Sequence, residues 1–407
     1  MNFDLTNLPP GFIDDPHPHY AALRAEAPVH ELPTGGLFLS RHADLLRVYK
    51  DRAVFSSDKK VEFRPKFGDS LLYEHHTTSL VFNDAPLHTR VRRAIAGALS
   101  PRAIAGMDSV VKTLVDRLIG ELEHRLDAGR TIDAVADFAQ NIPIEVIGNL
   151  LAIPRHERDP LRDWSLAILG ALEPEISAAQ FEHGELAVRD FLAYLERLVA
   201  RRRAEGIDSA TDIMARLIRE TGAAGEDANL LPHELLQNCI FILNAGHETT
   251  TNLICSGIWL LSQRPEIVDR LNADPDLWPA AVEEILRMES PNQLGNRRAL
   301  SAFEMDGRTW PEGTLITLGM GAANRDPAVF DDPDTFRLDR GDNPHLAFAG
   351  GAHVCAGNTI ARIEGQIALA GLFGRWPGLT VAAGMRRSPR VRFRGFEELP
   401  LLLDGKS

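Results

Sequence analysis

The sequence predicts a mainly α-helical fold with small β-sheets, and changes in residue pattern along its 407 residues indicate this. Between 84 and 290, apolar residues recur at helical spacing with few prolines. From 291 to 407, glycines and prolines interrupt the chain every few residues, and short strand-like pieces such as 314–318 lie between them. Residues 1–60 mix short strands with helices. We therefore expect helix to dominate, with small sheets contributed by 1–60 and 291–407.

The individual elements follow in chain order. We expect a helix near 20–24, two short strands within 29–40 and a helix over 43–49. Residues 55–83 show no clear period and are predicted to form a long loop, which in a compact domain is usually functional. The next helix is predicted to start with Asp84 as its N-cap and Pro86 in its first turn. A long helix from about 230 to 261 and a last one from about 356 to 373 complete the helical set.

Composition excludes several classes of protein. The 44 Lys and Arg against 57 Asp and Glu give a net charge of −13, which repels nucleic acid and anionic lipid. No run approaches the ~20 apolar residues of a membrane span, and the N-terminus lacks the basic and apolar segments of a secretory signal. The three cysteines, with no CxxC pair, indicate a reducing compartment. We expect a cytoplasmic protein with no membrane or nucleic-acid partner.

The segment with the most specific composition is 348–357, FAGGAHVCAG. Its three glycines and three alanines let the backbone approach a flat, bulky ligand closely. Cys355 is predicted to stand at the start of a helix, where the helix dipole favours thiolate, the metal-ligating form of cysteine. Haem iron needs only one such protein ligand. From this segment alone two alternatives stay open: a small buried cysteine in a tight turn, and a zinc site with His353 and His345 near in sequence.

A second segment, NAGHETTT at 244–251, lies in the middle of the long predicted helix. A glycine inside a helix costs about 1 kcal/mol relative to alanine, and consecutive threonines are poor helix formers. Small residues at Ala245 and Gly246 would open the helix wall beside a ligand. Glu248 followed by Thr249 pairs an acid with an alcohol, which suits proton delivery. The alternative is a Gly/Thr kink in a core helix, with His247 as an ordinary core residue.

Two further pairs share a helical face. Glu284 and Arg287, three residues apart in EILR, are by themselves no more than a common surface pair. His88 and Arg92, four apart in DAPLHTRVRR, are a possible clamp for carboxylates. The alternative for the DAPLHTRVRR segment is a solvated basic helix face.

The order and spacing of these segments resemble those of one known family. FAGGAHVCAG resembles the cysteine-loop signature of the cytochromes P450, AGHETT their oxygen-activating helix, EILR their Glu-x-x-Arg motif, and DAPLHTRVRR the haem-propionate helix of soluble bacterial members. The stretch from Gly321 to Arg340 is similar to the connecting region. The resemblance spans essentially the whole chain. It implies one domain over 1–407 with the cytochrome P450 fold, a triangular prism that holds haem b between the oxygen-activating helix and the cysteine-loop helix.

The resemblance also implies roles for individual residues. Cys355 would be the iron ligand, and Glu248 and Thr249 would deliver protons to dioxygen. Glu284, Arg287 and Arg340 would form a structural ion-pair network. Haem contacts would come from His88, Arg92, Arg297 and His353 at the propionates, from Phe348, Gly351 and Gly357 in the cysteine loop, where the two glycines form the turn, and from Ala245 and Gly246. Position 248 is Glu where many members carry Asp, and either acid preserves the chemistry.

The implied activity is monooxygenation of a small organic substrate with O2, by C–H hydroxylation or oxidative demethylation. The chain has no flavin or dinucleotide fingerprint and no cysteine cluster, so electrons would come from a ferredoxin or flavodoxin and an NAD(P)H-dependent reductase. Arg362 is a candidate docking contact or a solvent-facing surface residue. The alternatives are a peroxygenase and a non-enzymatic haem sensor, which the Glu248–Thr249 pair disfavours. The substrate pocket is predicted to include Ser79, Leu80, Phe241, Asn244, Ala245, His247, Gln293, Leu294 and Phe393.

Overall fold

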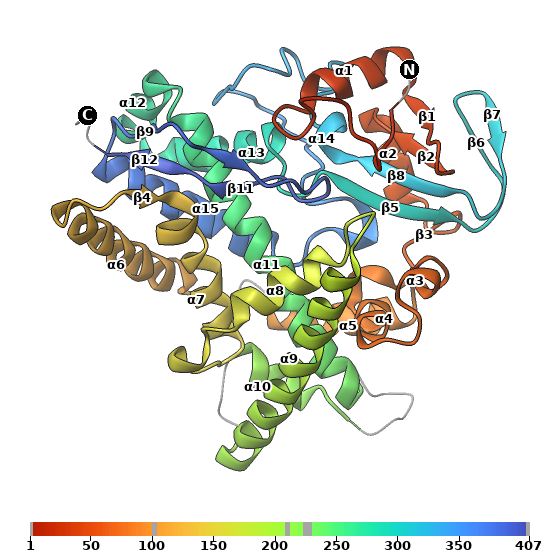
Figure 1. The fold of residues 1–407 in the computed structure, drawn as a ribbon, viewed down its shortest axis with the longest axis horizontal. Coiled ribbons are helices and arrows are strands. Elements are labelled where there is room, and N and C mark those ends of the chain that lie inside the picture. The colour runs from red at the N-terminus through yellow and green to blue at the C-terminus, as the bar shows by residue number, and fades with distance from the viewer. Residues whose placement is uncertain (1–2, 100–103, 208–211, 223–229, 404–407) are drawn as a thin grey trace. The chain divides into compact units, whose positions relative to one another are not determined.

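The computed structural model describes residues 3–99, 104–207, 212–222 and 230–403, and it confirms a mostly helical protein with small sheets (Figure 1). The chain divides into two compact units, which are described separately. The first contains Met1–Phe55, Gly106–Pro143 and Thr249–Ser407, and the second contains Ser56–Ala105 and Ile144–Glu248. Three elements straddle the boundaries: β3 (Phe55–Ser56), α7 (Asn141–Leu150) and α11 (Pro232–Leu261).

Within the described residues, the first unit carries the other β-strands together with helices from both ends of the chain and from 107–139. Its elements are α1 (His17–Glu26), β1 (Val29–Glu31), β2 (Leu37–Leu39), α2 (His42–Lys50), α6 (Met107–Asp127), β4 (Ile132–Asp133), the π-helical turn η2 (Ala134–Ala139), α12 (Pro265–Ala273), η4 (Pro275–Leu277), α13 (Trp278–Met288), β5 (Leu294–Ala299), β6 (Phe303–Met305), β7 (Arg308–Trp310), β8 (Leu315–Gly319), α14 (Met320–Ala323), η5 (Gly351–His353), α15 (Asn358–Arg375), β9 (Thr380–Val381), β10 (Arg386–Arg387), β11 (Phe396–Glu398) and β12 (Pro400–Leu402).

The main sheet has the strand order β1-β2-β8-β5-β3, as Figure 1 shows. Strand β2 runs parallel to β8 and antiparallel to β1, and β5 runs antiparallel to β8. Successive side chains of β2 point to opposite faces of the sheet. Leu37 and Leu39 pack in one buried cluster with Ile316, whereas Phe38 packs in another with Phe3. The predicted strands within 29–40 and 314–318 and the predicted helices near 20–24 and 43–49 are therefore confirmed.

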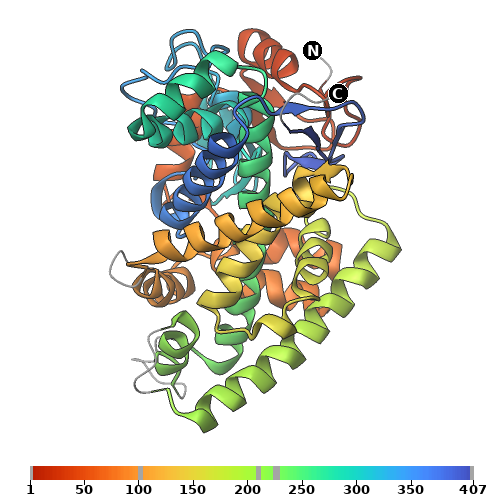
Figure 2. The same cartoon turned by 90° about the vertical axis from the view of Figure 1, so that its left-hand side faces the viewer.

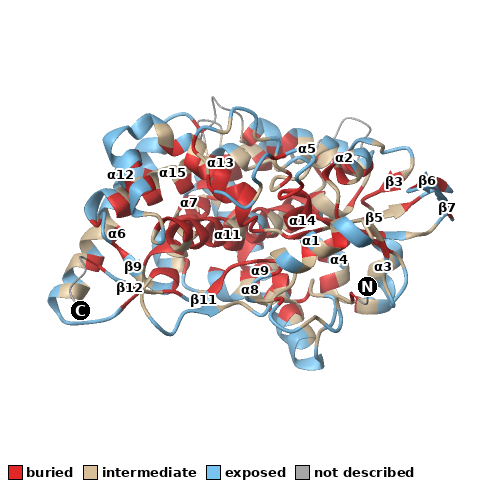
Figure 3. Ribbon diagram, turned by 90° about the horizontal axis from the view of Figure 1, so that it is seen from above, coloured by how far each residue is buried: buried red, intermediate tan, exposed pale blue. Residues whose placement is uncertain are grey.

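Helix α15 lies against α6, α13 and the last turns of α11, and α13 and α11 are largely buried (Figure 3). Two glycines permit the close approach of α11 and α15. A Cβ atom at Gly257 would lie 2.6 Å from Cδ1 of Leu369, and one at Gly365 would lie 3.0 Å from Cδ2 of Leu253. Larger residues at either position would push the two helices apart.

The second unit is helical. Its elements are α3 (Lys60–Phe67), α4 (Leu71–Thr78), η1 (Leu80–Phe82), α5 (Leu87–Ala98), η3 (Arg155–Glu157), α8 (Leu161–Gly170), α9 (Ala178–Glu205) and α10 (Ile213–Arg219). Helix α8 packs along the long helix α9, which also contacts α4, and the two views of Figure 1 and Figure 2 show α8 and α9 side by side.

The prediction of a long loop over 55–83 is wrong, because this stretch forms β3, α3, α4 and η1. Helix α4 begins with the Ser70 side chain accepting from the Tyr73 N–H, and the Glu185 carboxylate of α9 accepts from the backbone N–H groups of Leu71 and Leu72. These contacts supply the acceptors that the first turn of a helix lacks. A partner 114 residues away leaves no periodic trace in the local sequence.

The predicted capping role of Asp84 is also wrong. Helix α5 begins at Leu87 with Pro86 as its N-cap residue. The Asp84 carboxylate instead accepts hydrogen bonds from Ser56 Oγ and from the Ser57 N–H, at 2.5 and 3.0 Å. Asp84 therefore joins the start of this unit to α5.

Among the described residues, no helix is long and apolar enough to cross a membrane.

Candidate functional site

Cys355 is the one cysteine of this chain with an accessible side. Cys239 and Cys255 are completely buried in α11, and burial raises the pKa of the Cys239 thiol to about 12. Cys355 is only half-buried, and its neighbour Val354 is 38% exposed. All three cysteines are reduced. Cys239 and Cys255 are thus core residues, and Cys355 is the cysteine that lies outside the core.

The loop before α15 holds Cys355 through its backbone. The Cys355 N–H donates to the carbonyl of Phe348 at 3.0 Å, and the Asn358 side-chain amide donates to the Cys355 carbonyl at 2.6 Å. Helix α15 begins at Asn358, with Gly357 as its N-cap. The prediction that Cys355 starts this helix is therefore wrong, because Ala356 and Gly357 separate it from the first helical residue and its N–H is already used within the loop.

Tight backbone geometry shapes the same loop. Gly351 has a φ of +64°, and a Cβ atom there would lie 2.1 Å from the carbonyl oxygen of Tyr49, so only glycine fits. Ala349 also has a positive φ, +58°, a conformation that strains a residue with a side chain. Gly357 has an ordinary φ of −92°, so the predicted turn function applies to Gly351 and not to Gly357. A Cβ atom at Gly357 would meet nothing within 4 Å, and its Cα therefore borders open space.

A cluster of charged and aromatic side chains supports the loop from α13 and α15. Arg362 donates two hydrogen bonds to Glu283, at 2.6 and 2.8 Å, and a third to Asn358 Oδ1 at 2.8 Å. Its guanidinium stacks 4.6 Å above the Phe348 ring. His345 Nε2 lies 3.1 Å from the same Glu283 carboxylate. Arg362, predicted as a docking contact or a surface residue, is thus held by groups of this chain.

The charges of this cluster reinforce one another. Burial opposes ionisation of Glu283, but hydrogen bonds from Arg362 and His345 outweigh that effect and lower its pKa to about 2. The hydrogen bond from Arg362 to Glu283 in turn raises the pKa of Arg362, and the charge of Cys355 is a smaller cause in the same direction. Glu283 and Arg362 are therefore both ionised at neutral pH.

Glu284, next to Glu283, belongs to a second and fully buried network. Its two carboxylate oxygens accept from Arg287 Nη2 and Nε, both at 2.7 Å, and from Arg340 Nε at 3.3 Å. The side chains of Glu284 and Arg287 have no exposed surface. Arg287 also donates to the carbonyl oxygens of Asn324 and Pro333. The pair that looked like a common surface pair in the sequence therefore joins α13 to the segment leading to the cysteine loop.

The 244–251 segment continues α11 without a break. Ala245 is exposed and Phe241 and Thr249 are half-buried, whereas Asn244, His247 and Glu248 are buried. With ~100° between successive helical residues, Phe241 and Thr249 lie within about 40° of Ala245, and His247 lies about 200° away. Ala245 therefore sits on an accessible stripe, and the predicted pocket residue His247 lies on the far side of the helix. A Cβ atom at Gly246 would lie 2.7 Å from Ile147 Cδ1, so this glycine makes room for α7, and its predicted haem contact stays a prediction.

The predicted propionate contacts divide between the two units. In the first, Arg297 on β5 is buried, donates to the Asn296 carbonyl at 2.7 Å and lies 5.2 Å above the Tyr49 ring. His353 is half-buried in η5. In the second, His88 is buried and Arg92 half-buried on the same face of α5. Tyr49 also underlies Gly351, so it links Arg297 to the cysteine loop.

The predicted pocket residues of the second unit lie near the N-terminal half of α11. Asn238 Oδ1 accepts from the Leu80 N–H at 3.0 Å, and the Ser79 hydroxyl donates to the His75 carbonyl. The buried Asn244 Oδ1 has no hydrogen-bond partner within the described chain.

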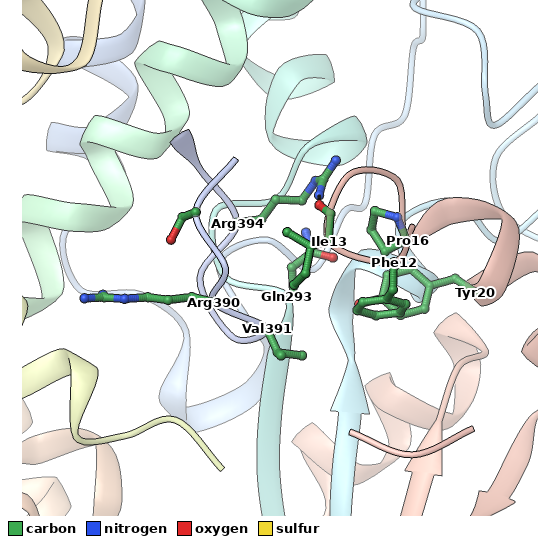
Figure 4. Close-up of a pocket in the computed structure, with 9 residues that line it drawn as sticks. Phe12, Ile13, Pro16, Tyr20, Gln293, Arg390, Val391 and Arg394 are labelled. Carbon is green, nitrogen blue, oxygen red and sulfur yellow. Dashed lines mark hydrogen bonds between the residues drawn. The ribbon is translucent and has the colours of Figure 1, made fainter. Parts of the chain in front are cut away.

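The predicted pocket residues of the first unit are Gln293, Leu294 and Phe393. Leu294 packs in the hydrophobic cluster of Phe38. Gln293 lines a small pocket with Tyr20 and Arg394 (Figure 4), and its Nε2 donates to the Ser290 carbonyl. Phe393 is buried and forms an isolated β-bridge with Asn292. Leu294 therefore packs in the core of the first unit, and its place in the pocket stays a prediction.

Sequence reasoning missed several residues that shape the site. Glu283, Asn358 and Tyr49 contact the cysteine loop or its supports, and of these only Glu283 had a visible cue, a second acid beside EILR. His345 was considered only as a zinc ligand, whereas it binds Glu283 in the structure. Within the described ranges, no three His, Cys, Asp or Glu side chains gather as a metal site. Zinc, which needs several such ligands, finds no ligand set there.

Comparisons with known proteins agree on one family. The family model described as cytochrome P450 matches residues 175–376. The biotin biosynthesis cytochrome P450 of Bacillus subtilis (strain 168) is 31% identical over 97% of both chains. The nocardicin C N-oxygenase of Nocardia uniformis subsp. tsuyamanensis is 35% identical over 92% of both. The crystal structure of P450BioI in complex with a hexadec-9Z-enoic acid-ligated acyl carrier protein superposes with a TM-score of 0.88, at 31% identity, over 96% of this chain and 99% of that one.

Proposed function

The chain belongs to the cytochrome P450 family, and on this premise we propose how its own residues serve the family's reaction. The protein is a haem-thiolate monooxygenase that uses haem b and O2 to oxidise a small organic substrate, with electrons from a redox partner. The single observation that carries the assignment to residues is Cys355, an accessible thiol on a tightly hydrogen-bonded loop.

Two features of the cysteine loop fit haem b. Cys355 is half-buried, and the Cα of Gly357 borders open space. On α11, taken by itself, Ala245 exposes a small side chain on an otherwise largely buried helix. A flat macrocycle needs such bare surfaces, and a thiolate is the iron ligand of this family. When bound, haem supplies the activation of O2 that amino-acid side chains cannot supply.

We propose that Cys355 holds the haem iron as a thiolate and that the loop fixes the direction of its sulfur. The hydrogen bonds that order this loop use the backbone N–H and carbonyl of Cys355. The strained Ala349 and the positive-φ Gly351 keep the loop in one conformation.

Glu248 and Thr249 are proposed to move protons. Glu248 is buried and Thr249 is half-buried on the stripe that carries Ala245. A buried acid beside a hydroxyl can hold a proton and pass it to a group or water within hydrogen-bond reach of Thr249 Oγ1. Thr249 therefore orients the last donor of the path, and Glu248 resupplies it.

Charge neutralisation is the proposed task of the cationic residues. Two haem carboxylates removed from water need charge-assisted hydrogen bonds. We assign Arg297 and His353 of the first unit and His88 and Arg92 of the second to this role. The Glu284–Arg287–Arg340 network is assigned to stability.

For electrons, we propose a ferredoxin or flavodoxin reduced by an NAD(P)H-dependent reductase. The net charge of −13 means that an acidic donor needs a local basic patch on this protein.

We also propose one catalytic domain over 1–407, and the continuity of α11 across the unit boundary supports this.

The experiment that tests this function starts from a library of small molecules screened for the low-to-high spin shift of the ferric protein. A molecule that shifts the spectrum is then turned over with NAD(P)H, a surrogate ferredoxin and its reductase under ¹⁸O-labelled dioxygen. We expect a product carrying one ¹⁸O atom. Products formed only with added peroxide would indicate a peroxygenase, and ligand binding without any product would indicate a sensor, and both outcomes contradict the proposal.

A further inference from the structure

The cysteine loop rests on an ion pair that neither the Glu-x-x-Arg motif nor the proposed proton path includes. Glu283 of α13 and Arg362 of α15 are 79 residues apart and form a bidentate pair. Their side chains are 27% and 32% exposed. The pair is therefore partly shielded from water, and its charges act more strongly on their surroundings than those of a surface pair.

Two chains of contacts connect this pair to Cys355. On one side Arg362 donates to Asn358 Oδ1, and the Asn358 amide donates to the Cys355 carbonyl at 2.6 Å. On the other side Arg362 stacks on Phe348, whose carbonyl accepts from the Cys355 N–H. Both backbone hydrogen bonds of Cys355 thus depend on groups that Arg362 contacts.

His345 completes the cluster from the loop itself. Its Nε2 faces Glu283 at 3.1 Å, its Nδ1 accepts from the Ala347 N–H at 3.3 Å, and its ring centroid lies 5.9 Å from that of Phe348. Phe348 therefore contacts both His345 and Arg362, and Glu283 binds both of them. A change in the charge of Glu283 or Arg362 therefore acts on the cysteine loop through Phe348 and His345.

We propose that Glu283 and Arg362 are positioning residues that orient the Cys355 thiolate and balance the charge around it, so that this ion pair sets the reduction potential of the bound cofactor. The inference rests on the proposed function of Cys355. Arg362 supplies a cation one residue away from the Cys355 backbone, through Asn358 on one side and Phe348 on the other, and Glu283 moderates that cation. An arginine fork suits this task better than a lysine, because it can bind a carboxylate bidentately and stack on a ring at the same time.

The proposal predicts opposite effects for the two members. One-electron reduction adds negative charge next to Cys355, so a nearby cation favours it and a nearby anion opposes it. Arg362→Gln leaves Glu283 without its counter-charge, and the potential becomes more negative. Glu283→Gln leaves Arg362 unbalanced, and the potential becomes more positive. In the double variant the two changes largely cancel.

The experiment measures the ferric–ferrous reduction potential of the holoenzyme by spectroelectrochemistry for the wild type, the two single variants and the double variant. Arg337→Gln is the matched control, because Arg337 forms an exposed pair with Asp339. We expect shifts of opposite sign in the single variants, a double variant nearer to the wild type than either, and no shift in the control. Arg362→Lys, which keeps the charge but loses the fork, should shift less than Arg362→Gln and serves if the latter does not fold.

Two results would overturn the inference. If Arg362→Gln raises only the KM for ferredoxin and leaves the potential unchanged, Arg362 is a docking contact. If both single variants shift the potential in the same direction and lose the red-shifted carbon monoxide band equally, the pair is merely structural. A wild-type protein without that band would contradict the proposed function itself, which is a separate failure.

Discussion

Replacing Glu284 by alanine should destabilise the protein more than any surface ion-pair change. Glu284 is completely buried and accepts two 2.7 Å hydrogen bonds from the equally buried Arg287, as well as bonds from Arg340 Nε, the Arg337 N–H and Asn343 Nδ2. Removing the carboxylate leaves the Arg287 cation without its counter-charge in a site that water does not reach.

The complete burial of Glu284 and Arg287 sets the expected loss of stability. Breaking a buried ion pair by removing one partner costs about 3–5 kcal/mol, a large share of the ~5–15 kcal/mol that stabilises a typical protein. Glu284→Gln keeps the shape but replaces one accepting oxygen by an amide NH2 group, which cannot accept from Arg287, so one of the two bonds is lost and the change should cost less than Glu284→Ala, about 2 kcal/mol. Glu121→Ala removes an exposed pair with Arg117 on α6 and should cost no more than about 0.5 kcal/mol.

Urea unfolding followed by far-UV circular dichroism measures these differences. The expected order of free-energy loss is Glu284→Ala, then Glu284→Gln, then Glu121→Ala. A Glu284→Ala protein that unfolds at the same urea concentration as Glu121→Ala would refute the argument that this network joins α13 to the segment before the cysteine loop.

Three further predictions concern the proton path, the loop and a buried acid. Thr249→Ala should retain haem but divert reducing equivalents to hydrogen peroxide, whereas Thr249→Ser should not, and unchanged coupling of NAD(P)H oxidation to product in Thr249→Ala would refute the proton-delivery role. Gly351→Ala, which places a Cβ atom 2.1 Å from the Tyr49 carbonyl at a φ of +64°, should cost about 2–4 kcal/mol in urea unfolding. Gly374→Ala, where a Cβ atom meets nothing within 4 Å, is the control, and equal costs would contradict the geometry. Burial raises the pKa of Glu364 to about 8, so the folded state binds a proton that the unfolded state releases above a pKa of about 4.5, and stability falls as pH rises between these values. Glu364→Gln should remove this fall, and parallel stability curves for the two proteins from pH 5 to 8 would be inconsistent with a buried, protonated carboxyl group.

The sequence predicted the parts of the fold that local pattern determines. The short strands within 29–40, the strand predicted over 314–318 and the long helix α11 all follow from residues within one element. Helices α3 and α4 did not, because each is only eight residues long. Contacts from distant elements stabilise α4, above all the Glu185 carboxylate at its N-terminus.

The candidate site was predictable where a motif carries it and not where folding assembles it. Cys355 and the Glu284–Arg287 pair were visible as motifs, but the complete burial of that pair was not. The role of Arg362 was not visible as a motif, because nothing in the sequence around it indicates a pair with Glu283, 79 residues earlier. His247 and Leu294 were assigned to the pocket by the family resemblance alone. The side of α11 on which His247 lies and the buried cluster that Leu294 joins are visible only in the folded protein.

The most direct test of the central claim is the carbon monoxide difference spectrum of the reduced protein. We predict the red-shifted Soret band of a thiolate-ligated haem for the wild type and its loss in Cys355→Ser, with Cys239→Ser and Cys255→Ser as controls that keep it. An unshifted band in folded wild-type protein, or a red-shifted band that persists in Cys355→Ser, would contradict the assignment of Cys355 as the haem ligand.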